Sequence, residues 1–408
     1  MHLGVKMIFK EYEFRPLILG GDITAYSLVR SFYEEYQVKS LVVNMSQGGA
    51  VAKSQLCDII YYENLEDESV FLKALNETAA KFKDKKLIVL GCGDWYVRML
   101  IENKDKLAEN FVIPYIDEEL MNKIVLKDLF YETCAELDIP HPKTFVYDCK
   151  EKTELTYDFD YPIIAKTANS AMYHYAEFPG KKKVFKFNSK QELEEMLANL
   201  ATSSYDYKFL IQEFIPGPDT NMRVLTCYSD QNAKVRFAAF GHVLLEEHTP
   251  SALGNPCCII NEVNDEVVAQ ATKFLEHIGY TGFSNFDIKY DPRDGKYKFF
   301  EINIRLGRSN YYVTGSGFNT VKLIVDDLIY GKEIPYHIAD KEHLFTFVPK
   351  SVIKKYVADE KMKAKALDLM KKGKWSNPLF YSKDKSLYHF VFSRLAFLNQ
   401  KKKFDTYM

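Results

Sequence analysis

The chain has 408 residues, which predicts two or three packed domains rather than one small domain. Apolar residues make up 47% of it, which excludes intrinsic disorder. No apolar run approaches the ~18–20 residues of a membrane-spanning helix, and the first residues do not form a signal peptide. Seven cysteines at irregular spacing favour a reducing cytoplasm. Cys257-Cys258 has no CxxC partner, so no zinc site is expected.

Charge is nearly balanced overall, with 54 basic and 56 acidic residues, but it is unevenly distributed. Residues 341–408 carry 16 Lys/Arg against 6 Asp/Glu, which leaves 38 against 50 in the rest of the chain. A basic C-terminal segment on an acidic body is attracted to anionic partners, such as a membrane surface, a nucleotide-linked substrate or nucleic acid. An ordinary solvated helical face is the alternative interpretation.

The first 118 residues show alternating strand and helix patterns, which predict a doubly wound parallel sheet. The expected strands are 15–19, 40–45, 58–62, 86–90 and 111–116, and the expected helices include 25–36 and 68–82. Two glycine turns follow strands of this set: Gly20-Gly21-Asp22 and residues 91–94. Ligands bind at the carboxyl ends of such strands, so Gly21 and Asp22 are candidate substrate residues. Plain turn chemistry is the alternative, because neither turn is a GxGxxG fingerprint.

A second domain is expected over residues 119–335, followed by a basic extension over 336–408. The second domain opens with one long helix over 117–138, and Pro140 and Pro142 mark the end of that helix. A small α+β unit covers about 144–213, with strands 144–147, 163–166, 183–187 and 209–213 and helix 190–200. From residue 222 the chain is rich in strands, at 223–228, 235–239, 286–290 and 297–302.

The strongest chemical signal is the hairpin formed by the last two strands. Alternate side chains of a strand share a face, so Glu301, Asn303 and Arg305 point the same way if the strand continues that far. The antiparallel neighbour can place Asp287 beside them. Two carboxylates and an amide oxygen are ligands that Mg²⁺ prefers, and an arginine next to them can stabilise charge on a transferring phosphoryl group. A polar exposed sheet face is the alternative.

Two weaker elements support a nucleotide site. The segment 210–219 is an apolar strand that leads through a turn to Asp219, and its extended backbone can bind an adenine edge while the acid reaches ribose. Lys123 lies on the long helix, and Lys166 ends an apolar strand, where it can bind phosphate. A lone lysine is usually solvated, so each of these residues alone is weak evidence.

In this order, over residues 15–335, the elements resemble the ATP-grasp carboxylate–amine ligases. The resemblance implies an α/β and α+β fold, in which two α+β subdomains clamp ATP after an N-terminal doubly wound domain. It also implies these roles: Lys123 and Lys166 on phosphate, Glu213 and Ile215 at adenine, Asp219 at ribose, Asp287, Glu301 and Asn303 on the metal, and Arg305, with Lys166, in catalysis.

One stretch departs from the family pattern. The family usually carries a glycine-rich phosphate lid after the second lysine, where residues 167–174 here include Ser170, the candidate nucleotide contact of this stretch. No glycine follows until Gly180. Small residues allow backbone amides to approach phosphate, but less freely than glycine does.

Within the superfamily, the chain most resembles the D-aspartate ligase group of peptidoglycan bridge-forming enzymes. The features that carry this resemblance are residues 302–312, 180–184, 246–250 and 375–379. It implies phosphorylation of the β-carboxylate of D-aspartate, followed by attack of a lysine ε-amine of a cell-wall precursor. Arg223 and Arg308 are candidates for holding the amino-acid carboxylate, with structural ion pairing as the alternative.

The resemblance also implies cofactors and partners. These are ATP with Mg²⁺, for which Mn²⁺ can substitute, two metal ions, and a UDP- or lipid-linked acceptor. The basic segment predicts peripheral contact with the inner face of the membrane, and no basic stripe interleaved with aromatics indicates nucleic-acid binding. The alternatives are a ligase that makes a small peptide or natural product, and a non-catalytic nucleotide-binding module at the membrane.

Overall fold

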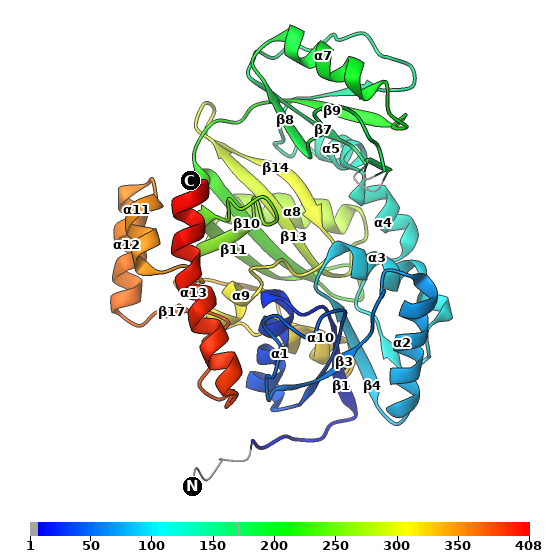
Figure 1. Ribbon diagram of the computed structural model, residues 1–408, viewed down its shortest axis with the longest axis vertical. Coiled ribbons are helices and arrows are strands. Elements are labelled where there is room, and N and C mark those ends of the chain that lie inside the picture. Colours follow the sequence, from blue (N-terminus) through cyan, green and yellow to red (C-terminus); the bar gives the residue numbers. More distant parts are fainter. Residues whose placement is uncertain (1–6, 170–171, 174) are drawn as a thin grey trace. The chain divides into compact units, whose positions relative to one another are not determined.

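The computed structural model describes residues 7–169, 172–173 and 175–408. The chain forms two compact units. Figure 1 shows the ribbon coloured from the N-terminus to the C-terminus. The first unit contains the chain up to Glu118 together with Pro218–Asn285 and Asn303–Met408. The second unit contains Glu119–Gly217 and Phe286–Ile302. Each unit therefore combines segments that are distant in sequence.

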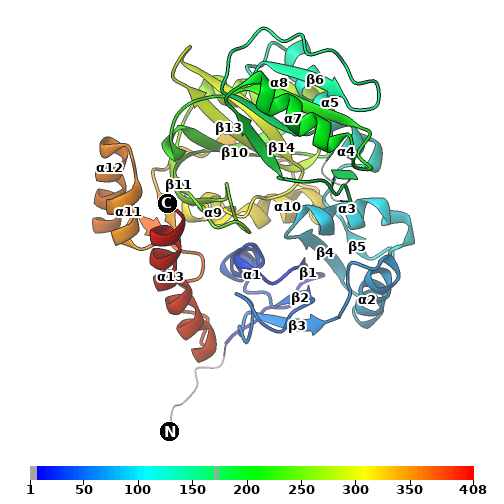
Figure 2. The ribbon, with the colours of Figure 1, turned by 45° about the horizontal axis from the view of Figure 1, so that its top comes forward.

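Five parallel strands in the order β3-β2-β1-β4-β5 form the N-terminal sheet of the first unit. They are β1 (Phe14–Leu19), β2 (Ser40–Asn44), β3 (Cys57–Tyr61), β4 (Lys86–Gly91) and β5 (Phe111–Val112). Ile18, Val42 and Ile88 share a core with α1 (Ile23–Tyr36), whereas the neighbouring residues Leu17, Leu41 and Leu87 share one with α2 (Glu68–Lys81) and α3 (Asp94–Glu102) (Figure 2). This alternation buries both faces, and it confirms the predicted doubly wound domain.

The strand order of this sheet reverses between β1 and β4. At such a reversal the following helices leave toward opposite faces, and the carboxyl ends of the two strands border an open crevice. The predicted glycine turns lie at these two ends, directly before α1 and α3. The fold therefore makes this edge the expected ligand site of the first unit.

The central sheet has eight strands, in the order β14-β13-β10-β11-β12-β16-β17 with β15 beside β11. They are β10 (Met222–Ser229), β11 (Val235–Glu246), β12 (Pro256–Glu262), β13 (Gly282–Asp291), β14 (Lys296–Asn303), β15 (His337–Ile338), β16 (Leu344–Thr346) and β17 (Trp375–Ser376). The boundary between the two units runs through β13 and β14. Because β15, β16 and β17 belong to this sheet, the residues after 336 contribute to the body of the first unit.

The remaining helices of the first unit lie between or after the strands of the central sheet in the chain order. They are α8 (Asp265–His277), α9 (Tyr311–Gly315), α10 (Thr320–Leu328), α11 (Lys350–Tyr356), α12 (Glu360–Lys371) and the long C-terminal α13 (Leu387–Tyr407), with short 3-10 turns η1 (Lys104–Lys106) and η2 (Asp219–Asn221). In the described part of the chain, no helix is both long and apolar enough to cross a membrane.

The second unit contains a four-stranded antiparallel sheet in the order β6-β9-β7-β8. Its elements are β6 (Thr144–Asp148), β7 (Ile163–Thr167), β8 (Val184–Phe187), β9 (Lys208–Glu213) and the helices α4 (Glu118–Val125), α5 (Lys127–Glu136) and α7 (Lys190–Leu200). Ile163, Phe185 and Phe209 from the sheet form a core with Leu193 and Leu197 of α7. This is the small α+β unit that the sequence predicts.

Two predicted elements are wrong in detail. The single helix over 117–138 is broken into α4 and α5 at Leu126, which is extended, and the amide of Lys127 donates a hydrogen bond to the Ala168 carbonyl (3.4 Å). A contact so distant in sequence is not visible in helical periodicity. Strand β14 ends at Asn303, so Arg305 does not continue the alternation of the strand.

Candidate active site

Two lysines of the second unit surround Glu301 near the end of β14. The Nζ of Lys127, the first residue of α5, lies 2.6 Å from Oε2 of Glu301. Lys127 and then Lys166 hold the pKa of the Glu301 carboxyl at about 2, against the opposing effect of burial. Glu301 is therefore ionised at any working pH, as a metal ligand must be.

Lys166 projects from β7, where the partly buried strand residues alternate. Its ammonium donates a hydrogen bond to the Tyr131 hydroxyl (3.2 Å) and lies 5.9 Å from the centre of the Phe300 ring. Burial and then the nearby Lys127 lower the pKa of Lys166 to about 7, although Glu301 opposes this. A bound polyanion would relieve the repulsion between the two lysines, so this pair suits a phosphate chain.

Lys127 was not among the sequence candidates, and the phosphate role of Lys123 stays a prediction. Lys123 lies on the exposed side of α4, whereas Lys127 contacts Glu301. The break at Leu126 accounts for the difference, because α5 starts anew at Lys127. Helical periodicity gives no signal for Lys127, because its contact with Glu301 joins residues distant in sequence.

The predicted metal residues lie on neighbouring strands. Asp287 is on β13, and Glu301 and Asn303 are two residues apart on β14, which places both side chains on one face of that strand. The Asn303 amide nitrogen donates to the Asn285 carbonyl (3.5 Å). Within the described residues, no three His, Cys, Asp or Glu side chains form a metal cluster. The predicted set has only two such side chains, Asp287 and Glu301, because its third member is an asparagine. Its carboxylate and amide oxygens nevertheless fit Mg²⁺.

The predicted adenine residues lie at the end of β9 in the second unit. Glu213 accepts a hydrogen bond from the Lys143 amide (2.9 Å) and pairs with Arg293 (2.6 Å), so its side chain fixes the end of the sheet. Ile215 is buried. The role of this segment's backbone at adenine stays a prediction. Ser170 lies outside the described residues.

Asp219, the predicted ribose ligand, lies in the first unit on η2. Its Oδ2 accepts hydrogen bonds from the Glu246 amide (3.0 Å) and from the His248 ring (2.9 Å). The carboxylate is thus oriented by β11 and the segment after it. Arg223, on β10, is buried and donates to the Thr220 carbonyl (2.8 Å) and the Met222 carbonyl (2.8 Å). Arg223 therefore supports the η2 turn, which favours the structural interpretation of this arginine.

Arg305 lies at the carboxyl edge of the N-terminal sheet. Its Nε donates to Oδ1 of Asp94, the first residue of α3, at 2.7 Å, and NH1 donates to the Leu306 carbonyl at 3.1 Å. Asp94 follows the second predicted glycine turn, so the β4 end contributes an acid at the same place in the turn–helix pattern as Asp22 after β1. That symmetry was the available sequence signal for Asp94.

Arg308 lies at the same edge, and the structure brings it together with Asp22. The Arg308 NH1 lies 2.7 Å from Oδ2 of Asp22, and its Nε lies 3.3 Å from Oε2 of the buried Glu247. Asp22 also caps α1 by accepting from the amides of Thr24 and Ala25. A cap that pairs with a guanidinium fixes the arginine at the helix start.

Gly21 has a packing reason to be glycine. A Cβ at this position would lie 2.2 Å from the Asn44 amide nitrogen at the end of β2. The turn before Asp22 can therefore approach β2 only without a side chain. Gly21 shapes the edge where Asp22 and Arg308 meet, and direct substrate contact stays a prediction.

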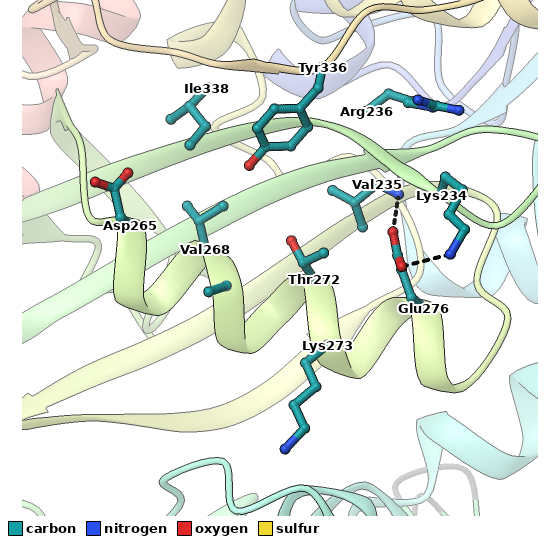
Figure 3. A pocket seen from close by; sticks show the side chains of 11 residues that line it. Lys234, Val235, Arg236, Asp265, Val268, Thr272, Lys273, Glu276, Tyr336 and Ile338 are labelled. Atoms are coloured by element: carbon teal, nitrogen blue, oxygen red, sulfur yellow. Dashed lines mark hydrogen bonds and ion pairs between the residues drawn. The ribbon is translucent and has the colours of Figure 1, made fainter.

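A cavity lies elsewhere in the first unit. It measures about 670 Å³, and α8 and β11 line it (Figure 3). In this hollow Glu276 pairs with Lys234 (2.9 Å) and accepts from the Val235 amide, while Val268 and Ile338 supply apolar walls. None of the predicted site residues lines it, so size alone does not mark the active site here.

Comparison with known proteins shows the family of this chain. Residues 127–317 match the family model described as carbamoyl-phosphate synthase L chain, ATP binding domain. The chain is 35% identical over 407 residues to the D-aspartate ligase of Enterococcus faecium (strain Aus0004), and the match covers 97% of this chain and 97% of that protein. The chain belongs to the ATP-grasp carboxylate–amine ligases. Within them it falls in the D-aspartate ligase group, as the sequence predicted.

Solved structures of other ATP-grasp enzymes share the fold of this ligase. The L-amino acid ligase from Bacillus licheniformis aligns with a TM-score of 0.55 at 16% identity, covering 78% of this chain and 75% of that one. The biotin carboxylase–β,γ-ATP complex from Campylobacter jejuni aligns with a TM-score of 0.58 at 14% identity, covering 79% and 72%. The predicted fold class and the predicted activity, an ATP-dependent carboxylate–amine ligase, are both confirmed.

Proposed function

We propose that this ATP-grasp ligase joins the β-carboxylate of D-aspartate to the lysine side-chain amine of a peptidoglycan precursor. The observation that carries the proposal is the match to a D-aspartate ligase over 97% of both chains, which includes the region after residue 336. The site supports it with a lysine pair for phosphate and with arginines beside the carboxyl edge of the N-terminal sheet.

The chemistry needs no protein nucleophile. The γ-phosphoryl group of ATP passes to a carboxylate oxygen, and ADP leaves. The amine then attacks the acyl phosphate carbon, loses a proton, and expels inorganic phosphate as the amide forms. Catalysis by this route depends on positioning and on neutralising charge.

Each site residue has a part in that scheme. Lys127 and Lys166 hold ATP phosphates, and Lys123 stays a predicted phosphate residue. Glu213, Ile215, Asp219 and Ser170 contact the nucleoside and phosphates. Asp287, Glu301 and Asn303 would hold Mg²⁺ or Mn²⁺, with two ions expected, and the metal would neutralise phosphate charge. Arg305 meets the charge that develops on the transferred group, and Asp94 positions it.

A panel of amino acids tests the proposed donor. ADP formation by the purified enzyme should be fastest with D-aspartate, and a UDP-linked muramyl pentapeptide containing lysine should raise it further. L-aspartate, D-glutamate and D-alanine serve as stereochemical, length and charge controls. A higher rate with a neutral amino acid, and an amide product with a second amino acid as acceptor, would assign a small-peptide ligase instead.

We also propose that α13 binds the surface of an anionic membrane. One side of the helix packs through residues such as His389 and Phe404, and the opposite side exposes Leu387, Val391, Leu395 and Leu398. These four residues, the α13 stripe, recur at helical spacing, with Arg394 and Lys402 beside them. An exposed apolar stripe with basic neighbours is typical of a helix that lies in a membrane interface. A lipid-linked acceptor would be met at such a surface.

Replacing Leu395 and Leu398 together by Ser should abolish co-sedimentation with vesicles that contain anionic lipids, because the apolar contact is lost. Raising ionic strength should weaken wild-type binding, since screening acts over a Debye length of ~8–10 Å. ADP formation in the absence of vesicles should stay unchanged. Equal sedimentation of both proteins, or a concentration-dependent dimer that the same substitutions abolish, would overturn the membrane assignment.

A further inference from the structure

A second, smaller cavity lies beside Arg308 in the first unit. It measures about 250 Å³, and its walls come from the Asp22 turn, Arg308 and α13. The apolar side consists of Phe347, Phe392 and Phe397. The polar side includes Gln400 and Lys403, two residues of the C-terminal helix. A cavity of this size suits an amino acid rather than a nucleotide or a drug-sized molecule.

Glu247 contacts three of the residues that line this cavity. It is only 2% exposed, and three side chains converge on it. Arg308 Nε lies 3.3 Å from Oε2, Lys403 Nζ lies 4.0 Å from Oε1, and the Gln400 amide nitrogen donates to Oε1 at 3.5 Å. One buried carboxylate thus holds two cations from segments almost a hundred residues apart in sequence.

Within the described residues, the hydrogen-bond donors of these two cations are not all used by this arrangement. Asp22 already accepts from the Thr24 amide, the Ala25 amide and the Thr24 hydroxyl besides Arg308. Its four lone-pair sites are therefore filled. Lys403 is 38% exposed and lies at the outer limit of an ion pair with Glu247, so its donors remain suited to a second anion.

Gln400 provides the complementary feature. It is 8% exposed, and its amide oxygen Oε1 accepts no hydrogen bond from any residue that the structure describes. A buried acceptor without a donor is destabilising. The same residue lines the cavity, so an N–H group of a ligand there would satisfy it. A carboxylate beside Arg308 and Lys403 with an ammonium beside Gln400 is the head group of an α-amino acid.

We infer that this cavity is the subsite for the head group of an amino-acid substrate, and that α13 supplies its specificity through Gln400 and Lys403. The inference rests on the proposed function, because an acidic donor keeps one carboxylate that is not phosphorylated. That carboxylate pairs with Arg308 and Lys403, and the ammonium meets Gln400. The C-terminal segment then has two separate faces: one lines the substrate subsite, and the other is the α13 stripe.

Lys403→Met tests the subsite, with Lys401→Met as the matched control. Lys401 also lies on α13, but it is 61% exposed and pairs only loosely with Asp405 (3.8 Å). Lys403→Met should raise the KM for the donor amino acid by roughly tenfold, the scale of one charge-assisted hydrogen bond, with little change in the KM for ATP. Lys403→Arg should restore most of the loss, because the cation returns. Gln400→Leu should weaken the donor similarly, since it removes the acceptor for the ammonium.

The donor panel is run on the wild-type enzyme first. A failure of the proposed function can then be distinguished from a failure of the proposed subsite. A wild-type preference for a different amino acid changes the proposed function, and the Lys403 and Lys401 variants are then compared on that amino acid. A selective rise in the acceptor KM would support the subsite and assign it to an amino-acid carboxylate of the acceptor. Equal kinetics of the Lys403 and Lys401 variants for donor and acceptor, with both proteins folded, would overturn the inference.

Discussion

Glu301→Gln should reduce ADP formation by about 10³-fold or more, while the protein remains folded. We propose that this carboxylate holds the metal, whose loss would remove several kcal/mol of charge stabilisation, and each 1.36 kcal/mol is a factor of ten in rate. The same change removes the partner of Lys127 and leaves Lys127 and Lys166 without the carboxylate between them. The amide keeps the shape of the side chain but not its charge, so the effect is electrostatic.

Steady-state rates over a range of Mg²⁺ concentrations measure this expectation. Glu132→Gln, on the exposed side of α5, is the matched control and should behave as the wild type. Far-UV circular dichroism and thermal melting establish that both variants fold. If Glu301→Gln keeps wild-type turnover and wild-type Mg²⁺ dependence, the metal site does not lie on β14.

Arg305→Ala should lower kcat by ~10²–10³-fold with much less change in the affinity for ATP, the scale for losing one preorganised charge stabiliser. The guanidinium stays protonated at any working pH, so it can meet phosphate charge throughout the reaction. Its Nε is held by Asp94 at 2.7 Å and its NH1 by the Leu306 carbonyl, so the group is fixed before substrate binds. Preorganisation of this kind favours the transition state over the ground state.

Three further variants separate the role of the charge from its position. Arg305→Lys should recover only part of the rate, because one ammonium does not reproduce a planar fork. Asp94→Asn should lower kcat less than Arg305→Ala, since it loosens the arginine without removing it. Arg98→Ala, which breaks the exposed pair with Glu102 on α3, should be silent. A collapse of ATP affinity with kcat preserved would make Arg305 a ground-state binding residue.

Local pattern was sufficient for much of the fold. The alternation of apolar strands and helices before residue 118 predicted the parallel sheet, because a helical crossover between two strands lets them run parallel. The loop between β13 and β14 was visible from its Pro, Asp and Gly residues, and helix α7 was predicted with the bounds that the structure has. Strand β12 and helix α8 were missed, and β11 extends seven residues beyond its predicted end. Long buried strands lack a clear alternation.

The candidate site shows which features local sequence pattern does not predict. Alternation correctly paired Glu301 with Asn303 on one strand face, but it could not show that β14 ends before Arg305. Helical periodicity ran through Leu126, because the contact made at the break, from the Lys127 amide to the Ala168 carbonyl, joins residues that are distant in sequence. The expected lysine was therefore Lys123, and the lysine that contacts Glu301 is Lys127.

The sequence by itself determined the doubly wound domain, the hairpin with its acids, and the family. Each of these depends on residues close together in the chain, or on residue patterns that the family shares. Only the tertiary structure decided which cations meet which carboxylates. Asp94 reaches Arg305, Asp22 reaches Arg308, and Glu247 gathers Arg308, Gln400 and Lys403. The physical reason is that a side-chain pair is fixed by the packing of whole elements, and spacing along the chain does not specify that packing.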